Sequence, residues 1–334
     1  MLNIIDRAEE ADRLKWSEMV SSADNGTLFQ MPEFYDFLAE SEGNDPFMFI
    51  GERNGCYDYL VSGSIQFSRN RLVRPFSRRA IVTGGIVTGK GADLADLPSF
   101  LESITGILKR RAVYLEIRNL HDYSNLTEIF EDKGFSRIPH LNYQVEITSV
   151  KETFSRLNQS RRRQVRKSLE GGAEVIVNPG REEVREFYAI LRETYRRRVH
   201  KPLPDEEFFL RFQRTGPGVY LLIRYSGRII GGIMCPVFGK KAIYEWYVAG
   251  EDGRYPGIYP SVLATWAAME YGANNRIGIF DFMGAGRPDE DYGVREFKSR
   301  FGGREVEHGR FLAVFNKTVY NAGRLLYGSR KRKT

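Results

Sequence analysis

Hydrophobic and polar residues alternate along the chain in two successive blocks that follow one order. A helical pattern opens each block, at 11–20 in the first and near 151–170 and 181–199 in the second. Two strand-like runs joined by a tight turn come next, followed by a third strand, a helix, a strand, a helix and a last strand. The first block predicts strands at 47–52, 57–67, 79–83, 113–117 and 143–147, with helices at 98–110 and 126–132. The second predicts strands at 219–224, 228–237, 242–249, 277–282 and 310–315, with helices at 261–271 and 294–300.

This repeated order indicates a duplicated domain. Asn54-Gly55 and Ser226-Gly227 mark the two equivalent hairpin turns. Helices that alternate with strands must cover the faces of a sheet, so each half is expected to be an α/β (α+β) domain with a central mixed β-sheet flanked by helices. The predicted domains are 1–148 and 149–334. A length of 334 residues fits two cores better than one.

The composition of the chain and the absence of certain motifs exclude several classes of protein. No apolar run approaches the roughly 20 residues that span a bilayer, and the N-terminus lacks an export signal, so we expect a cytoplasmic protein. Cys56 and Cys235 have no CxxC spacing and no paired histidine. There is also no HExxH or G-x-S-x-G motif. We therefore expect no metal site, no disulfide framework and no serine-type chemistry.

The charge of the chain is uneven. The net charge is +7, and five basic residues share one predicted helix: Arg161, Arg162, Arg163, Arg166 and Lys167. Like charges four residues apart repel each other, so an external anion would relieve the strain, although a solvated basic face explains the run equally well. A phosphate-bearing small molecule, RNA and an acidic membrane surface all satisfy this requirement.

One glycine-rich segment imitates a phosphate-binding loop. Gly84 to Lys90 satisfies G-x-x-x-x-G-K, but Gly91 follows where a P-loop needs Ser or Thr. A glycine-rich connection after a strand is the better interpretation.

A carboxylate lies within an apolar strand pattern. In Tyr244-Glu245-Trp246-Tyr247, alternation places Glu245 and Tyr247 on one face. A buried Glu245 would have a raised pKa and could act as a general base, whereas an ordinary ion pair with an arginine is the alternative.

The next segment predicts an anion site. Arg254 to Pro260 joins this strand to the helix at 261–271, and the free N–H groups and dipole of a helix N-terminus favour phosphate.

Several segments then resemble the FemAB family of aminoacyltransferases, in an order that covers nearly the whole chain. They are Leu157 to Ser160, Gly172 to Val175, Tyr247 to Gly250, Tyr259, Trp266, Asp281, and Glu296 to Gly303 with its Phe-Lys-x-x-Phe element. The resemblance implies two tandem GNAT-like domains in the compact form without a helical arm. It also implies transfer of an amino acid from aminoacyl-tRNA to an amine of a peptidoglycan precursor.

The resemblance assigns roles to individual residues. Lys298, next to Phe297, takes the place of the lysine at the reaction centre, where it would stabilise an oxyanion. Tyr259 or Tyr255, and Tyr114 in the first domain, match tyrosines that contact substrate. GNAT enzymes bind the acyl-CoA pyrophosphate through a turn of the form Q/R-x-x-G-x-G/A. Tyr259 stands where that turn needs a small residue, which argues against CoA.

Three further positions match the acceptor and phosphate contacts of the family with changes. Lys201 replaces a phosphate-binding arginine, Asp36 replaces an acceptor-binding lysine and Asn119 replaces an aspartate. These changes imply an acceptor different from a UDP-linked muropeptide.

The expected reaction is attack of an acceptor amine on an activated acyl group. Lys298 would stabilise the oxyanion, Tyr259 and Tyr247 would position the substrate, and Glu245 or Asp281 would accept the proton, with no cofactor. The expected partners are aminoacyl-tRNA, an anionic envelope precursor and, peripherally, the inner face of the membrane, but not DNA. The alternatives are an acyl-CoA-dependent N-acyltransferase in exopolysaccharide or envelope synthesis, and a non-catalytic RNA-binding or envelope-assembly adaptor.

Overall fold

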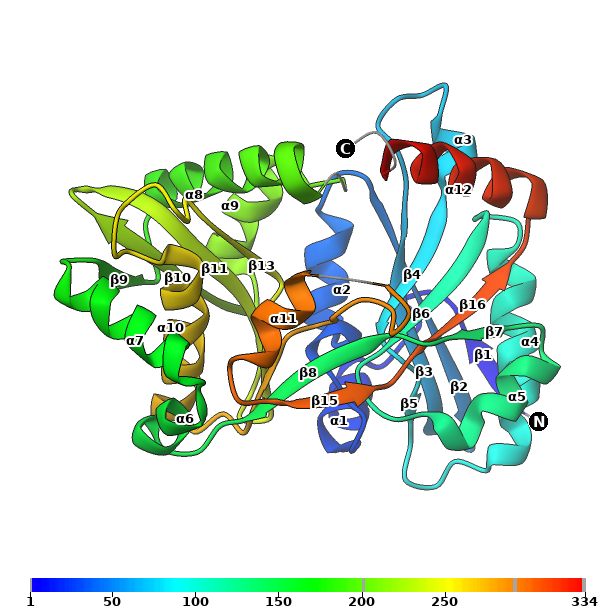
Figure 1. Ribbon diagram of the computed structural model, residues 1–334. Coiled ribbons are helices and arrows are strands. Elements are labelled where there is room, and N and C mark those ends of the chain that lie inside the picture. The colour runs from blue at the N-terminus through cyan, green and yellow to red at the C-terminus, as the bar shows by residue number, and fades with distance from the viewer. Residues whose placement is uncertain (1, 200–201, 291–292, 332–334) are drawn as a thin grey trace. The chain divides into compact units, whose positions relative to one another are not determined.

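The chain forms two compact units, each an α/β structure with one mixed sheet. The computed structural model describes residues 2–199, 202–290 and 293–331 (Figure 1). The first unit contains residues 1–139 and 308–334, and the second contains residues 140–307. The predicted duplication of a helix-flanked mixed sheet is therefore confirmed.

The first unit is built on an eight-stranded sheet in the order β1-β2-β3-β4-β6-β16-β7, with β5 paired to β3. The strands are β1 (Asn3–Ile5), β2 (Asn44–Arg53), β3 (Cys56–Gln66), β4 (Arg79–Gly84), β5 (Val87–Thr88), β6 (Tyr114–Asn119), β7 (Ser136–Ile138) and β16 (Arg310–Val314). Only β4 and β6 pair in parallel among these strands. The helices are α1 (Arg13–Ser22), α2 (Pro32–Ala39), α3 (Arg74–Ser77), α4 (Leu97–Leu108), α5 (Thr127–Asp132) and α12 (Lys317–Lys331).

The second unit repeats this plan in the order β15-β8-β14-β12-β11-β10-β9, with β13 paired to β11. Its strands are β8 (Leu141–Glu146), β9 (Glu174–Val177), β10 (Gly218–Tyr225), β11 (Arg228–Phe238), β12 (Ala242–Tyr244), β13 (Tyr247–Gly250), β14 (Ile279–Asp281) and β15 (Arg304–Glu307). Again one pair, β12 and β14, is parallel. Its helices are α6 (Val150–Arg156), α7 (Gln159–Glu170), α8 (Arg181–Thr194), α9 (Glu206–Thr215), α10 (Pro260–Asn274) and α11 (Gly293–Ser299).

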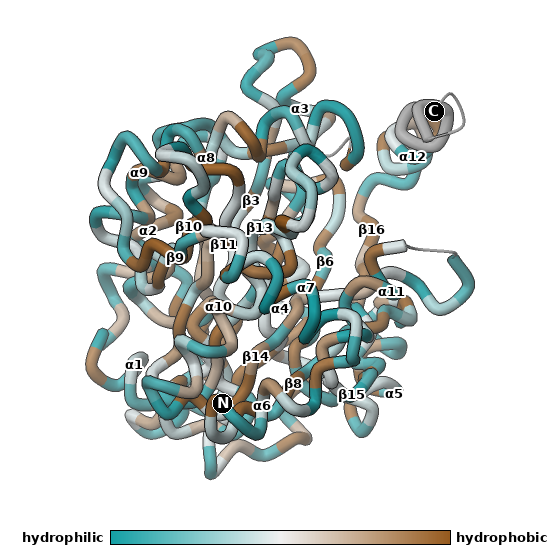
Figure 2. Tube along the Cα trace, turned by 60° about the vertical axis from the view of Figure 1, so that its left-hand side comes forward, coloured by the Kyte–Doolittle hydropathy of each residue, from teal (hydrophilic) through white to brown (hydrophobic). Residues whose placement is uncertain are grey.

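Each unit has its own hydrophobic core between sheet and helices. In the first unit the buried face of α4, including Phe100 and Ile104, packs with Tyr59 and Val61 of β3. In the second unit α10 is buried along most of its length, which explains its nearly continuous apolar sequence. Figure 2 shows hydrophobic segments following β10, β14 and α10, with polar segments outside.

The two hairpin turns form as predicted. Asn54 and Gly55 have φ of 50° and 78°, and Ser226 and Gly227 have φ of 50° and 79°. Two successive positive φ values match the twist of the flanking strands. The turn in β2–β3 and the turn in β10–β11 thus occupy equivalent places in the two units.

The boundaries of the units differ from the predicted 1–148 and 149–334. Strand β8 pairs with β14 and β15 in the second sheet, and β16 pairs with β6 and β7 in the first. The Phe311 ring of β16 stacks on Phe130 of α5 with centroids 3.9 Å apart. Each half of the sequence therefore supplies a strand to the other unit, an exchange that local patterns cannot reveal because strand pairing is nonlocal.

Two other segments clarify sequence motifs. After Gly84 and Gly85, with φ of 105° and 94°, the chain enters β5 rather than a helix, so it does not form a P-loop. A side chain at Gly85 would lie 2.4 Å from the Tyr123 hydroxyl, which explains the glycine. Within the described residues, no helix is both long and apolar enough to cross a bilayer.

Candidate active site

The strand predicted at 242–249 is interrupted in the second unit. β12 ends at Tyr244 and β13 begins at Tyr247; the two intervening N–H groups bond to carbonyls of different strands. The Glu245 N–H donates to the Asp281 carbonyl at 2.9 Å, and the Trp246 N–H donates to the Met234 carbonyl at 3.2 Å. β12 pairs with β14, whereas β13 pairs with β11. Glu245 therefore lies where the pairing along this strand changes.

A buried ion pair occupies this interruption. The Lys298 Nζ lies 3.0 Å from Glu245 Oε1, and the two side chains are 9% and 3% exposed. Nζ also donates to the carbonyls of Phe282 at 2.6 Å and Gly284 at 2.9 Å. Burial raises the pKa of Glu245, and the positive charge of Lys298 opposes that shift. Three acceptors thus surround the three N–H groups of the lysine.

Asp281 forms a second buried network at the end of β14. Its Oδ1 accepts from Asn142 Nδ2 at 2.8 Å and from the Met283 N–H at 2.6 Å, and its Oδ2 accepts from Gln144 Nε2 at 2.9 Å. The Gly284 N–H donates to Asn142 Oδ1 at 2.7 Å. Met283 and Gly284 have positive φ values of 56° and 125°. The network therefore fixes a sharply bent turn, residues 282–286. Lys298 binds two backbone carbonyls of the same turn.

The geometry does not favour the direct catalytic roles that the sequence predicted for Glu245, Asp281 and Lys298. Glu245, Asp281 and Lys298 do lie close to one another, joined by the Glu245 N–H bond to Asp281 and by the ion pair. Their polar atoms are already engaged with protein groups, so in this conformation none presents a free base or a free ammonium. The arrangement suits positioning of the 282–286 turn better than direct proton transfer.

Aromatic side chains line the segment that follows the interruption. Trp246 and Tyr247 are partly exposed, and Tyr247 lies against Tyr195 and Phe209 with ring centroids 6.2 and 5.0 Å apart. Phe208 packs edge-on against Trp246 at 5.4 Å. The cluster joins β13 to α9 and to the turn after α8. Tyr247 thus belongs to an aromatic wall that begins directly after Glu245 in the sequence.

The predicted anion site before α10 is already filled by the protein. Pro260 opens the helix without an N–H group, and the Ser261 N–H donates to Asp252 Oδ1 at 3.2 Å. The Tyr259 N–H donates to Ser168 Oγ of α7 at 2.9 Å. A carboxylate therefore takes the place that an anionic ligand would need, and the repulsion between two negative charges opposes phosphate there.

The other predicted residues of this turn serve internal contacts. Arg254 pairs with Glu251, with 2.6 Å between Nη1 and Oε1, and the Tyr255 hydroxyl donates to the same carboxylate at 3.2 Å. Tyr259 packs against the hydrophobic core of the second unit. The turn is therefore closed on itself rather than open to a ligand.

Helix α7 forms as predicted, but its basic residues divide into two groups. Arg161 is buried, stacks over the Phe297 ring at 4.4 Å and donates to Gln164 at 2.8 Å. Burial lowers its pKa, helped by the charge of Arg300. Arg162 donates to the Ser155 carbonyl at 2.7 Å. Phe297 and two of the five anion-binding residues predicted on this helix thus maintain the packing of α7.

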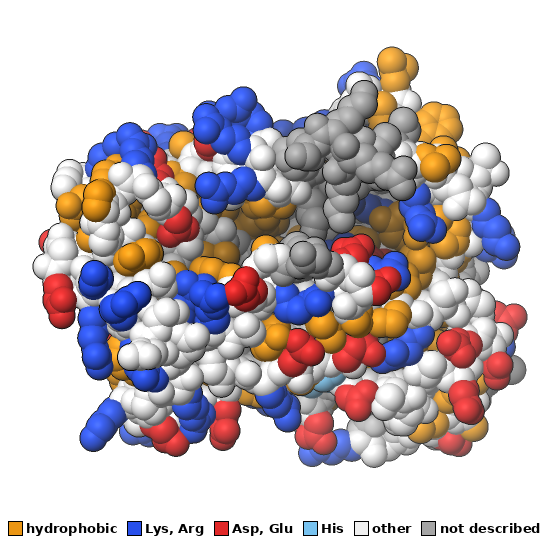
Figure 3. Space-filling model, viewed as in Figure 1, with side chains coloured by type: hydrophobic (Ala, Val, Ile, Leu, Met, Phe, Trp, Pro, Cys, Tyr) orange, Lys and Arg blue, Asp and Glu red, His pale blue; other side chains and the backbone are white. Residues whose placement is uncertain are grey.

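The remaining residues form an exposed basic edge. Arg163, Arg166 and Lys167 are exposed, and Arg166 lies 5.4 Å from the Phe154 ring. No carboxylate of the described residues is in ion-pair contact with Arg163 or Lys167. Figure 3 shows basic side chains gathered over this part of the second unit. Because Ser168 binds Tyr259, this edge lies directly beside the turn before α10.

The predicted residues of the first unit are dispersed. Asp36 is ion-paired to Arg13 on the surface. Tyr114 opens β6, with its ring 5.3 Å from Tyr320 of α12, and burial raises its pKa. Asn119 ends the same strand on the opposite face and donates to the His308 carbonyl at 3.1 Å. Five steps along a strand span about 17 Å, so Tyr114 and Asn119 cannot contact the same small group. Lys201 lies outside the described residues.

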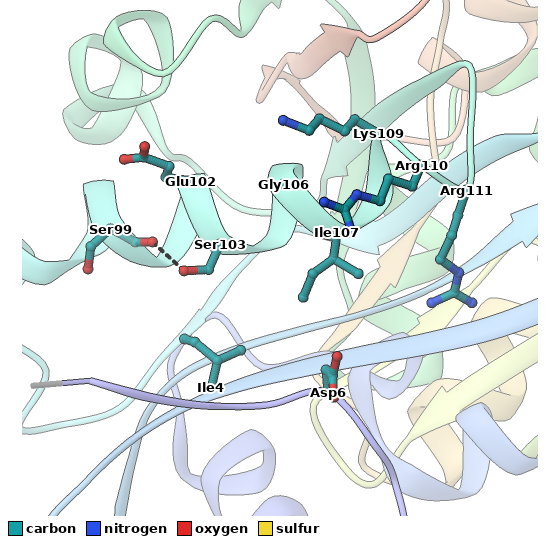
Figure 4. A pocket seen from close by; sticks show the side chains of 10 residues that line it. All are labelled: Ile4, Asp6, Ser99, Glu102, Ser103, Gly106, Ile107, Lys109, Arg110 and Arg111. Carbon is teal, nitrogen blue, oxygen red and sulfur yellow. Dashed lines mark hydrogen bonds between the residues drawn. The ribbon is translucent and has the colours of Figure 1, made fainter.

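A polar hollow in the first unit offers no alternative centre. It lies between β1 and α4 and is lined by Asp6, Glu102, Lys109, Arg110 and Arg111 among others (Figure 4). The charged side chains spread along an open surface, and Arg111 is bound to Asp45 at 3.3 Å.

Comparison with known proteins identifies the second unit. The model of the acetyltransferase (GNAT) domain family matches residues 155–298. The second unit is a GNAT domain. This match confirms the prediction of an acyltransferase. No curated protein matches the chain.

Solved structures extend the likeness to the whole chain. A structure of FemX matches with a TM-score of 0.70 at 15% identity, covering 95% of this chain and 99% of that one. The C-terminal domain of a putative lysylphosphatidylglycerol synthetase from Agrobacterium fabrum matches with a TM-score of 0.59 at 13% identity, covering 95% of each chain. A tandem GNAT protein from the clavulanic acid pathway gives 0.58 at 11%, covering 94% and 99%. The tandem GNAT fold implied by the FemAB resemblance is confirmed.

Within this GNAT domain, several residues that shape the site were not predicted. Asp252 and Ser168 close the turn before α10, and no local pattern marks them because their partners lie 9 and 91 residues away. Asn142 and Gln144 do carry a signal: two polar residues at spacing two place amides on one face of a strand.

Proposed function

We propose that the protein is a FemAB-like N-acyltransferase that moves an aminoacyl group from aminoacyl-tRNA to an amine of a cell-envelope precursor. The observation that carries the choice of donor is the closed turn before α10. Asp252 and Ser168 take the N–H groups of Ser261 and Tyr259. A CoA pyrophosphate would have to displace a carboxylate of the protein itself.

The exposed edge of α7 supports an RNA donor. Arg163, Arg166 and Lys167 lie along one side of a helix that contacts the same turn. An extended polyanion is suited to such a row, because each phosphate neutralised releases counterions and adds binding free energy. The FemX structure and the lysylphosphatidylglycerol synthetase domain share the fold, which is consistent with aminoacyl transfer in envelope synthesis.

The proposed reaction needs little chemistry from the protein. The acceptor amine attacks the ester carbonyl, a C–N bond forms, the C–O bond to the ribose breaks, and the ribose oxygen receives a proton. The aromatic wall at Trp246 and Tyr247 would hold the aminoacyl group against the 282–286 turn. Lys298, Glu245 and Asp281 would fix that turn, so they act as positioning residues. Proximity accounts for most of the expected acceleration.

The test is transfer of radiolabel from a mixed pool of aminoacyl-tRNAs to a crude envelope-precursor extract, with labelled acetyl-CoA in parallel. We expect label to move from tRNA. In the variant Arg163→Ala/Lys167→Ala, KM for tRNA should rise about tenfold or more with kcat unchanged, and the salt dependence of binding should weaken. The control Lys109→Ala/Arg110→Ala removes two exposed charges from the first unit.

Other outcomes would decide against the proposal. Transfer from acetyl-CoA alone would favour the CoA-dependent acyltransferase. Salt-dependent binding of RNA without any transfer would favour the adaptor.

A further inference from the structure

The connection between β3 and β4 is longer than its geometry requires. Gln66 of β3 pairs with Arg79 of β4, so the two antiparallel strands are already aligned where the connection begins. Two to five residues commonly close such a hairpin. Residues 67–78, here called the β3–β4 loop, instead project beyond the sheet and contain the single turn of α3 (Figure 1).

The loop is ordered by its own polar groups. The Ser68 N–H donates to Ser77 Oγ at 2.9 Å, and Ser77 Oγ donates to the Arg74 carbonyl at 3.1 Å. Asn70 Oδ1 accepts from the Leu72 N–H at 3.0 Å. The Arg74 guanidinium lies over the Phe67 ring at 4.0 Å. The base of the loop is thus a defined structure.

Its apolar side chains point away from that base into solvent. Leu72 is 84% exposed, Phe76 is 64% exposed and Val73 is 47% exposed. Single exposed apolar residues are common, but three on one short loop form a patch, and such patches mark interaction sites. In the same unit, Leu325 of α12 is also 75% exposed.

The charges around this patch are of one sign. Residues 67–79 contain five arginines and no acidic residue. Arg69 and Arg78 are balanced by Glu42 and Asp45, each at 3.3 Å. Arg71 and Arg74 are exposed, and in the part of the chain that the structure describes neither has a carboxylate in ion-pair contact. Figure 3 shows hydrophobic and basic side chains together at this end.

We propose that the β3–β4 loop docks the protein on an anionic phospholipid surface, with Leu72, Val73 and Phe76 inserted among the acyl chains and the arginines at the headgroups. Interfacial anchors combine these two features, because burial of apolar side chains and attraction to anionic headgroups add together. RNA would use the arginines but would gain nothing from an aliphatic tip such as Leu72. The proposal does not depend on the transfer reaction.

Vesicle flotation tests the proposal directly. We expect the intact protein to float with vesicles of phosphatidylcholine containing phosphatidylglycerol, and to bind at least about tenfold less to phosphatidylcholine alone. Leu72→Ser/Phe76→Ser should reduce binding to the anionic vesicles about tenfold or more, since each lost side chain removes apolar area from the bilayer. The matched control Leu14→Ser/Leu94→Ser changes two leucines of the same unit, 76% and 42% exposed, and should bind as the parent does. Equal binding by both double variants overturns the proposal, as does failure of the parent to bind.

A depth measurement separates insertion from simple charge attraction. Compared with the parent, the Phe76→Trp variant should show a blue shift of tryptophan emission on anionic vesicles. Brominated acyl chains should quench this emission. Free inorganic phosphate should produce neither effect. Arg71→Gln should weaken binding at low salt, whereas Arg110→Gln should not. An unshifted emission from the Phe76→Trp variant on bound vesicles would mean that the loop does not insert. Self-association that Leu72→Ser/Phe76→Ser abolishes, without vesicle binding, would assign the patch to a second copy of the chain instead.

Discussion

At the scale of single residues, the main feature of the candidate site is a buried ion pair. Lys298 and Glu245 are almost fully removed from water, and each is the charged partner of the other. The attraction between two buried opposite charges offsets their loss of hydration only if their remaining hydrogen-bonding groups find partners. Here two carbonyls accept the other N–H groups of the ammonium. A lysine that sequence similarity places at a reaction centre is thereby tied to the fold itself.

Removal of one partner should therefore destabilise the second unit. We expect Lys298→Met to lower the free energy of unfolding by about 3–5 kcal/mol, because it leaves the Glu245 carboxylate buried and unpaired. The double variant Lys298→Met/Glu245→Gln should lose less free energy of unfolding than the sum of the losses in the two single variants. Urea denaturation of the parent, both single variants and the double variant would measure these losses. Simple additivity would mean that the two groups are energetically independent. A double variant that is well folded yet inactive would show that the pair is needed for transfer beyond maintaining stability.

Glu116, whose side chain is 13% exposed, gives the first unit a dependence on pH. Although burial opposes it, Arg118 and Arg310 lower the pKa of Glu116 to about 2, since both guanidinium groups bind its oxygens. The pKa of Glu116 in the folded protein lies below its unfolded value of 4.5, so its ionisation stabilises the fold above that pH, and the stabilisation disappears as the pH falls towards 2.

We therefore expect Glu116→Gln to lower the free energy of unfolding by about 3 kcal/mol at pH 7 and by almost nothing near pH 2. Thermal unfolding across this range would measure the difference between parent and variant. Glu102→Gln is the control, because Glu102 is 74% exposed. A Glu116→Gln effect that is the same at both pH values would contradict the assignment.

At the scale of elements, the start of α10 is capped by a carboxylate of the chain itself. A helix N-terminus attracts anions, and in this chain Asp252 supplies the anion from within. Asp252 is also joined to the Ser261 hydroxyl, so the cap binds two groups of one residue.

Asp252→Ala should lower the free energy of unfolding by about 1 kcal/mol, the usual cost of a lost helix cap. Asp252→Asn should cost less, because the amide oxygen still accepts from the Ser261 N–H. Equilibrium denaturation would compare both with Arg254→Ala, whose exposed charge should matter little. If the alanine variant is as stable as the parent, Asp252 does not cap α10.

At the scale of the whole molecule, the chain exchanges strands between its two units. β8 follows the first half in sequence but lies in the second sheet, and β16 ends the second half but lies in the first. Neither half of the sequence therefore contains a complete sheet.

Fragments should reflect this exchange. We expect residues 140–307 to unfold cooperatively when produced alone, because they contain every strand of their sheet. Residues 149–334 should not, because they lack β8 and leave β14 with an unpaired edge. Circular dichroism with thermal unfolding distinguishes the two. Cooperative unfolding of 149–334, with failure of 140–307, would contradict the exchange.

The sequence by itself determined the elements and their duplication. Hydrophobic periodicity, the turns at Asn54-Gly55 and Ser226-Gly227, and the apolar run of α10 are local, so they identified the strands, the helices and their duplication. The tandem GNAT plan came from the resemblance to the FemAB family. Only the tertiary structure decided which sheet receives β8 and β16, because pairing depends on residues far apart in sequence. It also decided that Lys298 is enclosed by Glu245 and two carbonyls, and that Asp252 closes the turn before α10. Those contacts form between separate segments, and the physical state of a charged side chain depends on what surrounds it after folding.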